Sequence, residues 1–227
     1  MTYLISDIHG EYDLFIKLLK KINFSQNDKM VICGDIIDKG TDSIKLIKFI
    51  RKQRNIYCIL GNHEYSFLKY YYGLMRESSD NYDIVLEKLQ EYFSNDKEIL
   101  DWEDVDWLET LPFYIEEDCF ICVHAGVPLD NLGNVLNLSC AKKELLVSDR
   151  YFKEPKVKPI TKKCIFFGHT PTSYVSQTNK ILKYKKENTL GESVKDFYKI
   201  HLDIGVWIHG VLGCICLENL NEYYVAK

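Results

Sequence analysis

Long apolar runs and an excess of basic residues are both missing from this sequence. Because no stretch of about 18 uninterrupted apolar residues occurs, we predict no membrane-spanning helix. The 29 lysines and arginines are outnumbered by 33 acidic residues, for a formal net charge of -4. A protein that binds nucleic acid mainly by neutralising phosphates needs the opposite balance, so we expect no nucleic-acid partner. The first residues form neither a basic segment nor a signal-like apolar segment, and we expect a cytoplasmic protein.

A cysteine framework for disulfides or zinc is also missing, although the chain has 8 cysteines. Four of them lie inside apolar runs, where cysteine behaves as a small hydrophobic side chain: Cys33, Cys58, Cys122 and Cys164. Cys119 and Cys122 have the spacing of a zinc-ligand pair, but no second pair completes a set of four ligands. We therefore predict reduced, buried thiols rather than a cysteine-based site.

Three apolar segments, each followed by a polar loop, open the chain. Apolar residues spaced three and four apart predict helices after the first two segments, and Thr41 or Asp42 is placed to cap the second helix. The predicted strands cover residues 3–6, 30–33 and 56–60, and the predicted helices cover residues 11–22 and 44–50. The order of strand, loop and helix is typical of a parallel βαβ layer, whose ligand site lies beyond the carboxyl ends of the strands.

The rest of the chain adds a helical region and a second set of strands. Helix-forming, acidic and aromatic residues dominate residues 73–111, which we predict to be a helical insertion or cap. Further strands are predicted at residues 113–115, 119–123, 164–167, 181–184, 197–204, 211–217 and 223–226, with a short helix around residues 141–147. We predict one domain over residues 1–227, of the α/β class, with two sheets, helices outside them and a site at one rim.

Side chains that can bind metal stand at the predicted ends of five strands, each beside a glycine. They are Asp7, His9, Asp35, Asn62, His124 and His169. Asp7 and His9 are separated by one residue, so on an extended backbone their side chains point to the same side. Carboxylate, imidazole and carboxamide ligands without thiolates suit Mn²⁺, Fe or Zn²⁺. Two such ions about 3.5–4 Å apart, bridged by one carboxylate, would form a clamp for phosphoryl displacement by an activated water.

Five ordered motifs carry a resemblance to a known family. They are Gly34-Asp35-x-x-Asp38, Gly61-Asn62-His63-Glu64, His124-Ala125-Gly126, Gly168-His169 and Leu202-Asp203-Ile204-Gly205. Together they resemble the calcineurin-like metallophosphoesterases over nearly the full chain, and within that family the bacterial and phage-type serine/threonine protein phosphatases. The resemblance implies a two-sheet metallophosphoesterase sandwich flanked by helices, with a metal site at the carboxyl ends of the strands.

The resemblance also implies two divalent metal ions, with Mn²⁺ favoured and Fe or Zn²⁺ as alternatives. The ligands of one ion would be Asp7, His9 and Asp35, and those of the other would be Asp35, Asn62, His124 and His169. The same resemblance makes His63 the general acid that protonates the leaving oxygen, oriented by Asp38. The competing interpretation of a single histidine, a structural residue of the core, is less favoured when four of them stand together at strand ends.

Residues beside the motifs bear on the substrate. Pro171 stands where many phosphodiesterase relatives carry a further histidine ligand, and Glu64 stands where the diesterase and dinucleoside branches often have aspartate. Both features favour a protein phosphatase. Lys39 and Arg150 are the candidates for binding the substrate phosphate, although the phosphatases usually have arginine in place of Lys39. A leucine directly before Gly-Asn-His, here Leu60, is instead a point in which the sequence resembles the symmetrical dinucleoside tetraphosphatases.

The sequence therefore predicts a metal-dependent phosphomonoester hydrolase. A serine/threonine-type protein phosphatase is favoured over the alternative, a hydrolase similar to symmetrical bis(5'-nucleosyl)-tetraphosphatase. A catalytically silent metal-binding scaffold is the alternative from another class, and the presence of both His63 and Asp38 argues against it. The expected partner is a phosphoprotein, a phosphopeptide or a small phosphoester, with neither nucleic acid nor membrane.

Overall fold

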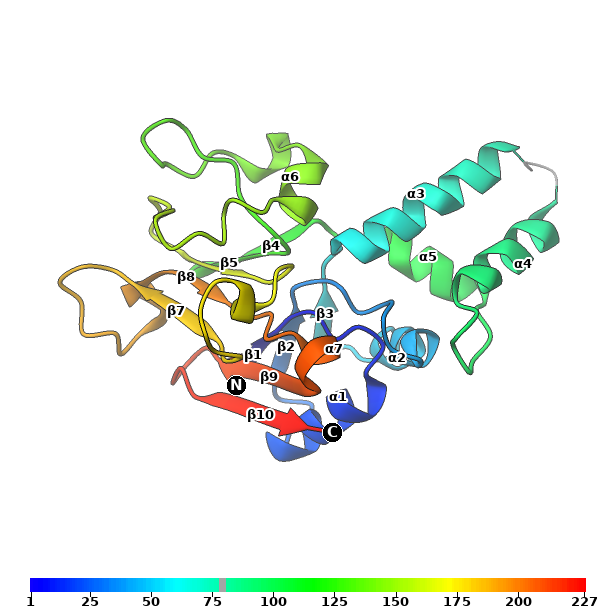
Figure 1. Cartoon of the computed structure of the whole chain (residues 1–227), viewed down its shortest axis with the longest axis horizontal. Helices are drawn as coiled ribbons and strands as arrows, with labels where there is room; N and C mark the ends of the chain where they lie inside the picture. The colour runs from blue at the N-terminus through cyan, green and yellow to red at the C-terminus, as the bar shows by residue number, and fades with distance from the viewer. Residues whose placement is uncertain (78–80) are drawn as a thin grey trace.

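Ten strands form two five-stranded sheets in the computed structural model, which describes residues 1–77 and 81–227 (Figure 1). The first sheet has the order β10-β9-β1-β2-β3. Its strands are β1 (Thr2–Ile5), β2 (Lys29–Ile32), β3 (Ile56–Cys58), β9 (Val211–Cys216) and β10 (Glu222–Ala226). β1, β2 and β3 run parallel, as the βαβ pattern predicts, and the end of the chain returns to add β9 antiparallel to β1.

The second sheet comes from the later part of the chain and has the order β4-β5-β6-β8-β7. Its strands are β4 (Tyr114–Glu116), β5 (Phe120–Val123), β6 (Cys164–Phe167), β7 (Leu182–Lys185) and β8 (Phe197–His201). β5, β6 and β8 are parallel, and the edge strands β4 and β7 are antiparallel to their neighbours. The two sheets and their outer helices confirm the predicted α/β sandwich.

Helices lie outside the sheets. They include α1 (Tyr12–Lys21), α2 (Ser43–Ile50), α6 (Lys143–Ser148), α7 (Val206–His209) and the 3-10 turns η1 (Leu138–Cys140), η2 (Thr172–Tyr174) and η3 (Val194–Asp196). Of these, α1 and α2 each begin just after a loop that follows a parallel strand. Asp42 stands at the N-cap position of α2, as expected, but its side chain makes no capping hydrogen bond. The first two amides of α2 donate instead to the carboxylate of Asp96, each over 3.0 Å.

Alternate residues of the central strands face two different apolar layers. Leu4 of β1 and Val31 of β2 pack between the sheets, in one cluster with Phe166 of β6. Ile5 and Ile32, one position further along the same strands, pack on the opposite face with residues of α1 and α2. Successive side chains of a strand point to opposite faces, so burial of both faces explains why these strands are continuous apolar runs in the sequence.

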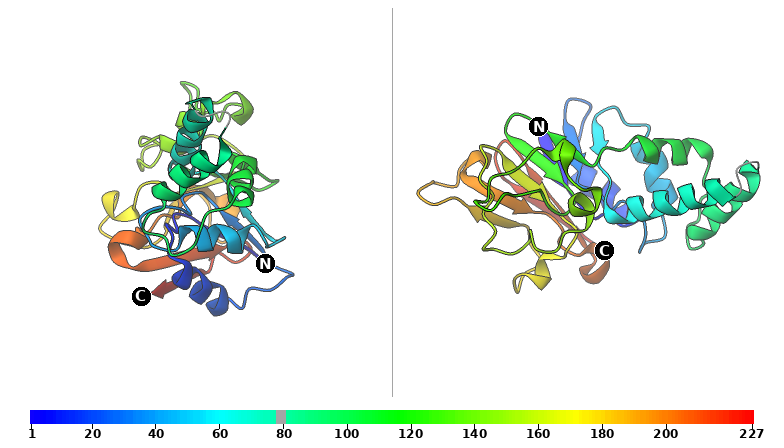
Figure 2. Two further views of the ribbon diagram at one scale, coloured as in Figure 1. Left: turned by 90° about the vertical axis from the view of Figure 1, so that its right-hand side faces the viewer. Right: turned by 90° about the horizontal axis from the view of Figure 1, so that it is seen from above.

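Three further helices project away from the sheets (Figures 1 and 2). They are α3 (Asn62–Glu77), α4 (Tyr82–Tyr92) and α5 (Trp102–Thr110), and together they form what we call the helical insertion. The helices begin at Asn62 rather than near Gly73, because the carbonyl of Gly61 already accepts a helical hydrogen bond from Tyr65 N over 3.0 Å. The insertion therefore starts directly at the end of β3, among the candidate site residues.

Ion pairs fasten the helical insertion to α2. Nζ of Lys48 lies 2.8 Å from the carboxylate of Asp101, and Nε of Arg51 lies 2.9 Å from that of Asp104. The Asp104 side chain is fully buried, and a buried charge is tolerated only when it is paired in this way. The base of the insertion is thus held against the helix that follows β2.

The structure also bears on the predictions about membrane-spanning helices and about the burial of the cysteines. Within them, no helix is both long enough and apolar enough to cross a membrane. All eight cysteines are free thiols, and the buried ones are Cys33, Cys58, Cys122, Cys164, Cys214 and Cys216, which confirms the predicted core thiols. Cys119 is half-buried and Cys140 is exposed. No cysteine belongs to a group of candidate metal ligands in the described part of the chain.

Candidate active site

All six predicted metal ligands lie at one rim of the sandwich, where strands of both sheets end. Asp7 and His9 follow β1, Asp35 follows β2, Asn62 follows β3, His124 follows β5 and His169 follows β6. Backbone hydrogen bonds join neighbouring loops, from His9 N to Asp35 O over 3.0 Å and from Gly168 N to His124 O over 2.8 Å. The fold therefore brings together side chains from five segments of the chain, and we call them the ligand cluster.

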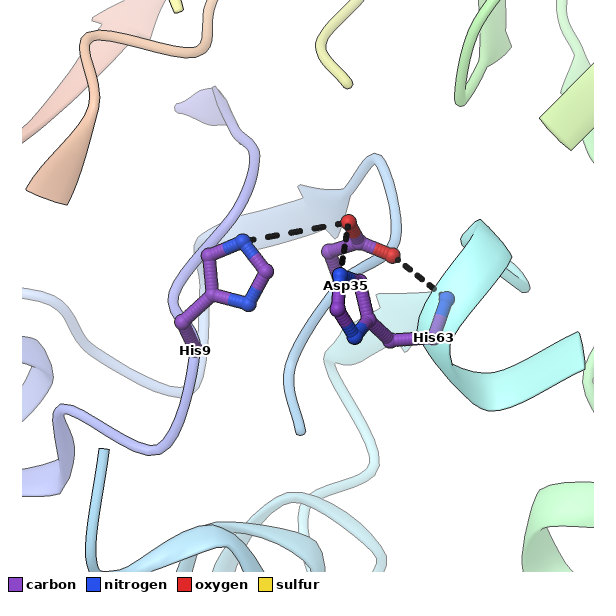
Figure 3. A group of neighbouring side chains, drawn as sticks. All are labelled: His9, Asp35 and His63. Atoms are coloured by element: carbon purple, nitrogen blue, oxygen red, sulfur yellow. Dashed lines mark hydrogen bonds and ion pairs between the residues drawn. The ribbon is translucent and has the colours of Figure 1, made fainter. Parts of the chain in front are cut away.

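The carboxylate of Asp35 lies close to several histidine rings, and Figure 3 shows it beside those of His9 and His63. Its Oδ2 lies 3.3 Å from Nε2 of His124 and 3.8 Å from Nε2 of both His9 and His63. Its Oδ1 accepts a hydrogen bond from the backbone N–H of His63 over 3.1 Å. Asp35 thus belongs to two groups of donor atoms, one with His9 and His63 and one with His124 and His169, each spanning no more than 4.8 Å.

Two histidine rings of the ligand cluster are oriented by backbone carbonyls. Nδ1 of His9 lies 3.0 Å from the carbonyl oxygen of Ile37. Nδ1 of His124 lies 2.8 Å from the carbonyl oxygen of Cys33. A carbonyl can only accept, so Nδ1 is the donor in each ring, and Nε2 is the nitrogen that faces Asp35. Metal-binding histidines are commonly held in this way through their second nitrogen.

Buried atoms without a partner show that the ligand cluster suits a cation. Among the described residues, Oδ1 of Asp7 and Nε2 of His169 are buried and make no hydrogen bond. Such atoms are rare in folded proteins, because each one costs about 1–3 kcal/mol. Oδ1 of Asn62 lies 2.7 Å from Nδ1 of His169 and 3.1 Å from Nε2 of His124. Carboxylate, carboxamide and imidazole donors that converge like this fit divalent cations.

Acidic groups are concentrated in the buried part of the ligand cluster. Burial raises the pKa of the Asp7 carboxyl well above its usual value, and the neighbouring Asp203 adds to this rise. Burial also raises the pKa of Asp203 to about 7. At Asp35 burial acts in the same direction, but the charge and hydrogen bond of His124 outweigh it and hold the pKa below its usual range. A divalent cation would stabilise the charged form of all three carboxylates, which supports the same conclusion as the unpaired atoms.

Four of the six candidate ligands have backbone conformations that non-glycine residues seldom adopt. The φ angle is +53° at Asp7, +50° at His9, +55° at Asp35 and +71° at His169. Such conformations cost about 1–3 kcal/mol each and cluster at functional sites. The motif glycine Gly61 permits the close packing that results, because a Cβ there would overlap Oδ1 of Asp35.

Glu64 has a supporting role in the site that the sequence alone did not reveal. Its fully buried carboxylate accepts four backbone hydrogen bonds of 2.8–3.1 Å, from Asp35 N, Ile36 N, Ile37 N and Gly61 N. These amides belong to the loops after β2 and β3, so one side chain fixes both loops beside the ligand cluster. The only sequence signal is the place of Glu64 in the Gly-Asn-His-Glu motif, which says nothing of the distant amides.

Replacing Glu64 by glutamine is expected to lower the free energy of unfolding by about 3 kcal/mol. The new NH₂ group would face two backbone N–H donors and leave them unpaired, at about 1–3 kcal/mol each. Urea denaturation with a chelator present measures this loss without a contribution from bound metal. Glu87→Gln on the exposed surface of α4 is the matched control, and should change stability by less than about 0.5 kcal/mol. Equal stability of the two variants would contradict this role.

His63 and Asp38 form a pair beside the ligand cluster. Nδ1 of His63 lies 2.6 Å from Oδ2 of Asp38. Burial lowers the pKa of His63, but the hydrogen bond to Asp38 and the charges of Asp35 and Asp38 outweigh it and raise the pKa above its ordinary value. A protonated imidazole suits a general acid. His63 also belongs to one group of donor atoms with His9 and Asp35, so its alternative role is to bind an ion.

The two candidate phosphate-binding residues are Lys39, which follows Asp38 in the chain, and Arg150, whose charge acts on His169. Nζ of Lys39 lies 5.3 Å from the ring centre of Trp207, a cation–π contact. Arg150 is exposed, and its guanidinium makes no hydrogen bond or ion pair with other described residues. Burial and the neighbouring His124 lower the pKa of His169 to about 3, and the charge of Arg150 contributes to this effect. Positive charge is therefore available at the rim.

Comparisons with known proteins agree with this geometry. A family model described as calcineurin-like phosphoesterase matches residues 2–210. Two similar curated proteins, from Vibrio parahaemolyticus and Wigglesworthia glossinidia brevipalpis, are both named bis(5'-nucleosyl)-tetraphosphatase, symmetrical. The first is 30% identical over 128 residues, covering 56% of this chain and 44% of the relative. The second is 37% identical over 130 residues, covering 55% of this chain and 44% of the relative.

A solved structure extends the likeness to the whole fold. A crystal structure provisionally assigned as a diadenosine tetraphosphatase has a TM-score of 0.69 and 18% identity, covering 100% of this chain and 93% of that one. The chain spans less than half the length of the two curated relatives. Their names match the dinucleoside alternative, so the serine/threonine protein phosphatase that the sequence favoured gains no support from them.

Proposed function

The chain belongs to the calcineurin-like phosphoesterase family, and from this membership we propose that it is a metal-dependent phosphohydrolase that cleaves dinucleoside polyphosphates. The observation that supports the activity is the carboxylate of Asp35, which belongs to two groups of candidate ligands at once. A structural ion needs only one closed set of ligands. Two sets that share a carboxylate are instead the arrangement suited to phosphoryl displacement.

Two divalent cations fit the donor atoms of the ligand cluster. One would be held by Asp7, His9 and Asp35, and the other by Asp35, Asn62, His124 and His169. When bound, such cations polarise the phosphoryl oxygens and lower the pKa of water toward about 7. Donors of oxygen and nitrogen without sulfur suit Mn²⁺, Fe and Zn²⁺, and the family resemblance favours Mn²⁺ among them.

Side chains of the protein itself would supply the remaining chemistry. His63 would donate a proton from Nε2 to the leaving oxygen, because its Nδ1 is engaged with Asp38. Asp38 orients this imidazole and favours its protonated form. Lys39 and Arg150 place positive charge near the ligand cluster, where it would attract the phosphates of the substrate.

Two pairs of a cation and an aromatic ring support a substrate with a nucleoside at each end. One pair is Lys39 with Trp207, a residue that is 50% exposed. The other is Lys156 with Tyr151, a residue that is 60% exposed and follows Arg150 in the chain; Nζ of Lys156 lies 5.5 Å from its ring centre. Positive charges bind phosphates and exposed rings stack on bases, so each pair offers what one half of a dinucleotide requires. The names of the curated relatives support the same substrate class.

The proposal predicts that kcat/KM is at least about tenfold higher for diadenosine tetraphosphate than for a phosphothreonine peptide. Both substrates are assayed with Mn²⁺ at one pH, and the products of the first are resolved by chromatography. Symmetrical cleavage should yield ADP alone, and a chelator should abolish the reaction until Mn²⁺ is restored. A higher kcat/KM for the peptide would contradict the proposed substrate and support a protein phosphatase instead. No turnover of either substrate with Mn²⁺, Fe²⁺ or Zn²⁺ would contradict the proposed activity.

A further inference from the structure

Helix α4 of the helical insertion reaches the proposed acid pair through one hydroxyl group. Tyr92, at the end of α4, donates a hydrogen bond to Oδ2 of Asp38 over 3.1 Å. The same oxygen accepts the hydrogen bond from His63, so it carries two donors. Burial and the charge of Asp38 raise the pKa of Tyr92, which keeps its hydroxyl protonated and able to donate. Helix α4 thus contributes a polar contact to a site otherwise built at strand ends and at the start of α3.

The ring of Tyr92 is held in place by aromatic neighbours on α3. It stacks on Tyr70, with ring centres 6.0 Å apart and planes inclined by 29°. It also meets Phe67 edge-on, with ring centres 5.3 Å apart. Phe67 is fully buried, so this packing does not depend on an exposed side chain. The position of the hydroxyl therefore follows from the packing of α3 against α4.

The loop that carries Asp38 is fastened to the same part of the insertion. Asp38 N donates to Oγ of Ser43 over 3.2 Å, and Ser43 N in turn donates to the carboxylate of Asp96, which follows α4. Asp38 and Lys39 have φ angles of +66° and +68°. A loop with two such residues needs contacts that hold it in this conformation. The backbone contact through Ser43 and the side-chain contact through Tyr92 both do so.

We infer that Tyr92 is a positioning residue for the reaction, and that it holds the Asp38 carboxylate in line with the His63 imidazole. The inference rests on the proposed function, because it assumes that His63 protonates the leaving group. Without the hydroxyl, the carboxylate is free to rotate about its side-chain bonds, and the imidazole loses its fixed direction. Helix α4 would then matter for proton transfer although it supplies no candidate metal ligand.

The test is Tyr92→Phe, which removes the hydroxyl and keeps the packed ring. We expect kcat for phenyl phosphate to fall about tenfold, the effect of one hydrogen bond to a charged group, with KM and metal content unchanged. For 2,4-dinitrophenyl phosphate, whose leaving group needs no proton, the loss should be less than about twofold. Tyr70→Phe is the matched control, because it removes a hydroxyl from the ring stacked on Tyr92 and should leave both rates unchanged.

A double variant tests whether Tyr92 acts through Asp38. In an Asp38→Asn background, Tyr92→Phe should cause no further loss of kcat for phenyl phosphate. Both changes disrupt the same alignment of Asp38 with His63. A crystal structure of Tyr92→Phe should show the Asp38 carboxylate turned from Nδ1 of His63, a result that does not depend on activity. An unmoved carboxylate, equal losses on both esters, or additive losses in the double variant would overturn the inference. Absence of metal-dependent turnover of diadenosine tetraphosphate by the wild type would instead overturn the proposed function.

Discussion

A variant with asparagine in place of Asp35 is expected to lose at least about 10³-fold in kcat for metal-dependent hydrolysis. Oδ2 of Asp35 lies within 3.8 Å of Nε2 of His9 and within 3.3 Å of Nε2 of His124, which belong to different ligand groups. Asparagine keeps the size of the side chain but removes its charge. Both cations would therefore lose the same negatively charged ligand, and metal content should fall from about two ions per chain to fewer than about one.

Metal analysis and a rate assay on the same sample measure this effect. The protein is dialysed with Mn²⁺, freed of unbound ions and examined by inductively coupled plasma mass spectrometry. Asp118→Asn, an exposed position in the turn between β4 and β5, is the matched control and should retain metal and activity. Circular dichroism confirms that each variant is folded. Two bound ions and wild-type turnover in Asp35→Asn would contradict its role as the shared ligand.

Replacement of His63 by asparagine should lower turnover of phenyl phosphate by about 10²–10⁴-fold, the usual contribution of a positioned general acid. Its Nδ1 is occupied by Asp38 at 2.6 Å, which leaves Nε2 to serve the leaving oxygen. The loss should be much smaller for 2,4-dinitrophenyl phosphate, because that leaving group departs without a proton. His209→Asn, at the exposed end of α7, is the control and should leave both rates unchanged.

The metal content of His63→Asn decides between its two roles. His63 lies in one group of donor atoms with His9 and Asp35, so it could bind an ion instead of supplying a proton. A general acid can be removed without loss of metal, and we expect about two ions per chain in the variant. Loss of one ion, with equal losses of rate on both esters, would show that His63 is a ligand. The leaving-group dependence and the metal analysis therefore give independent answers.

Local patterns in the sequence were sufficient to predict the fold and to place the ligand cluster. The runs that became β1, β2 and β6 are apolar at successive positions, because both of their faces are buried. Polar residues follow directly where these runs stop, and the carboxyl ends of parallel strands meet at one edge. The position of each candidate ligand along the chain therefore already specified its place in the fold.

Contacts between distant segments could not be predicted in the same way. Asp96 caps α2 in place of the adjacent Asp42, and Tyr92 reaches Asp38, which lies 54 positions earlier in the chain. Both contacts depend on how the helical insertion packs beside α2. Apolar periodicity shows which side of a helix is buried, but not which residue of another segment it meets. Asp96 and Tyr92 belong to no sequence motif, so nothing in the sequence indicated these two roles.

What the sequence by itself determined is the set of strands and the candidate ligands at their ends, because burial periodicity and ligand chemistry are properties of short segments. What only the tertiary structure decided is how those ligands are held. The Glu64 carboxylate accepts hydrogen bonds from backbone amides of two loops. The carbonyl oxygens of Ile37 and Cys33 fix the orientation of the His9 and His124 rings, respectively. The partners in these contacts are backbone amides and carbonyls, which every residue carries, so no residue type marks them. They become specific only when the packed sheets bring one loop against another.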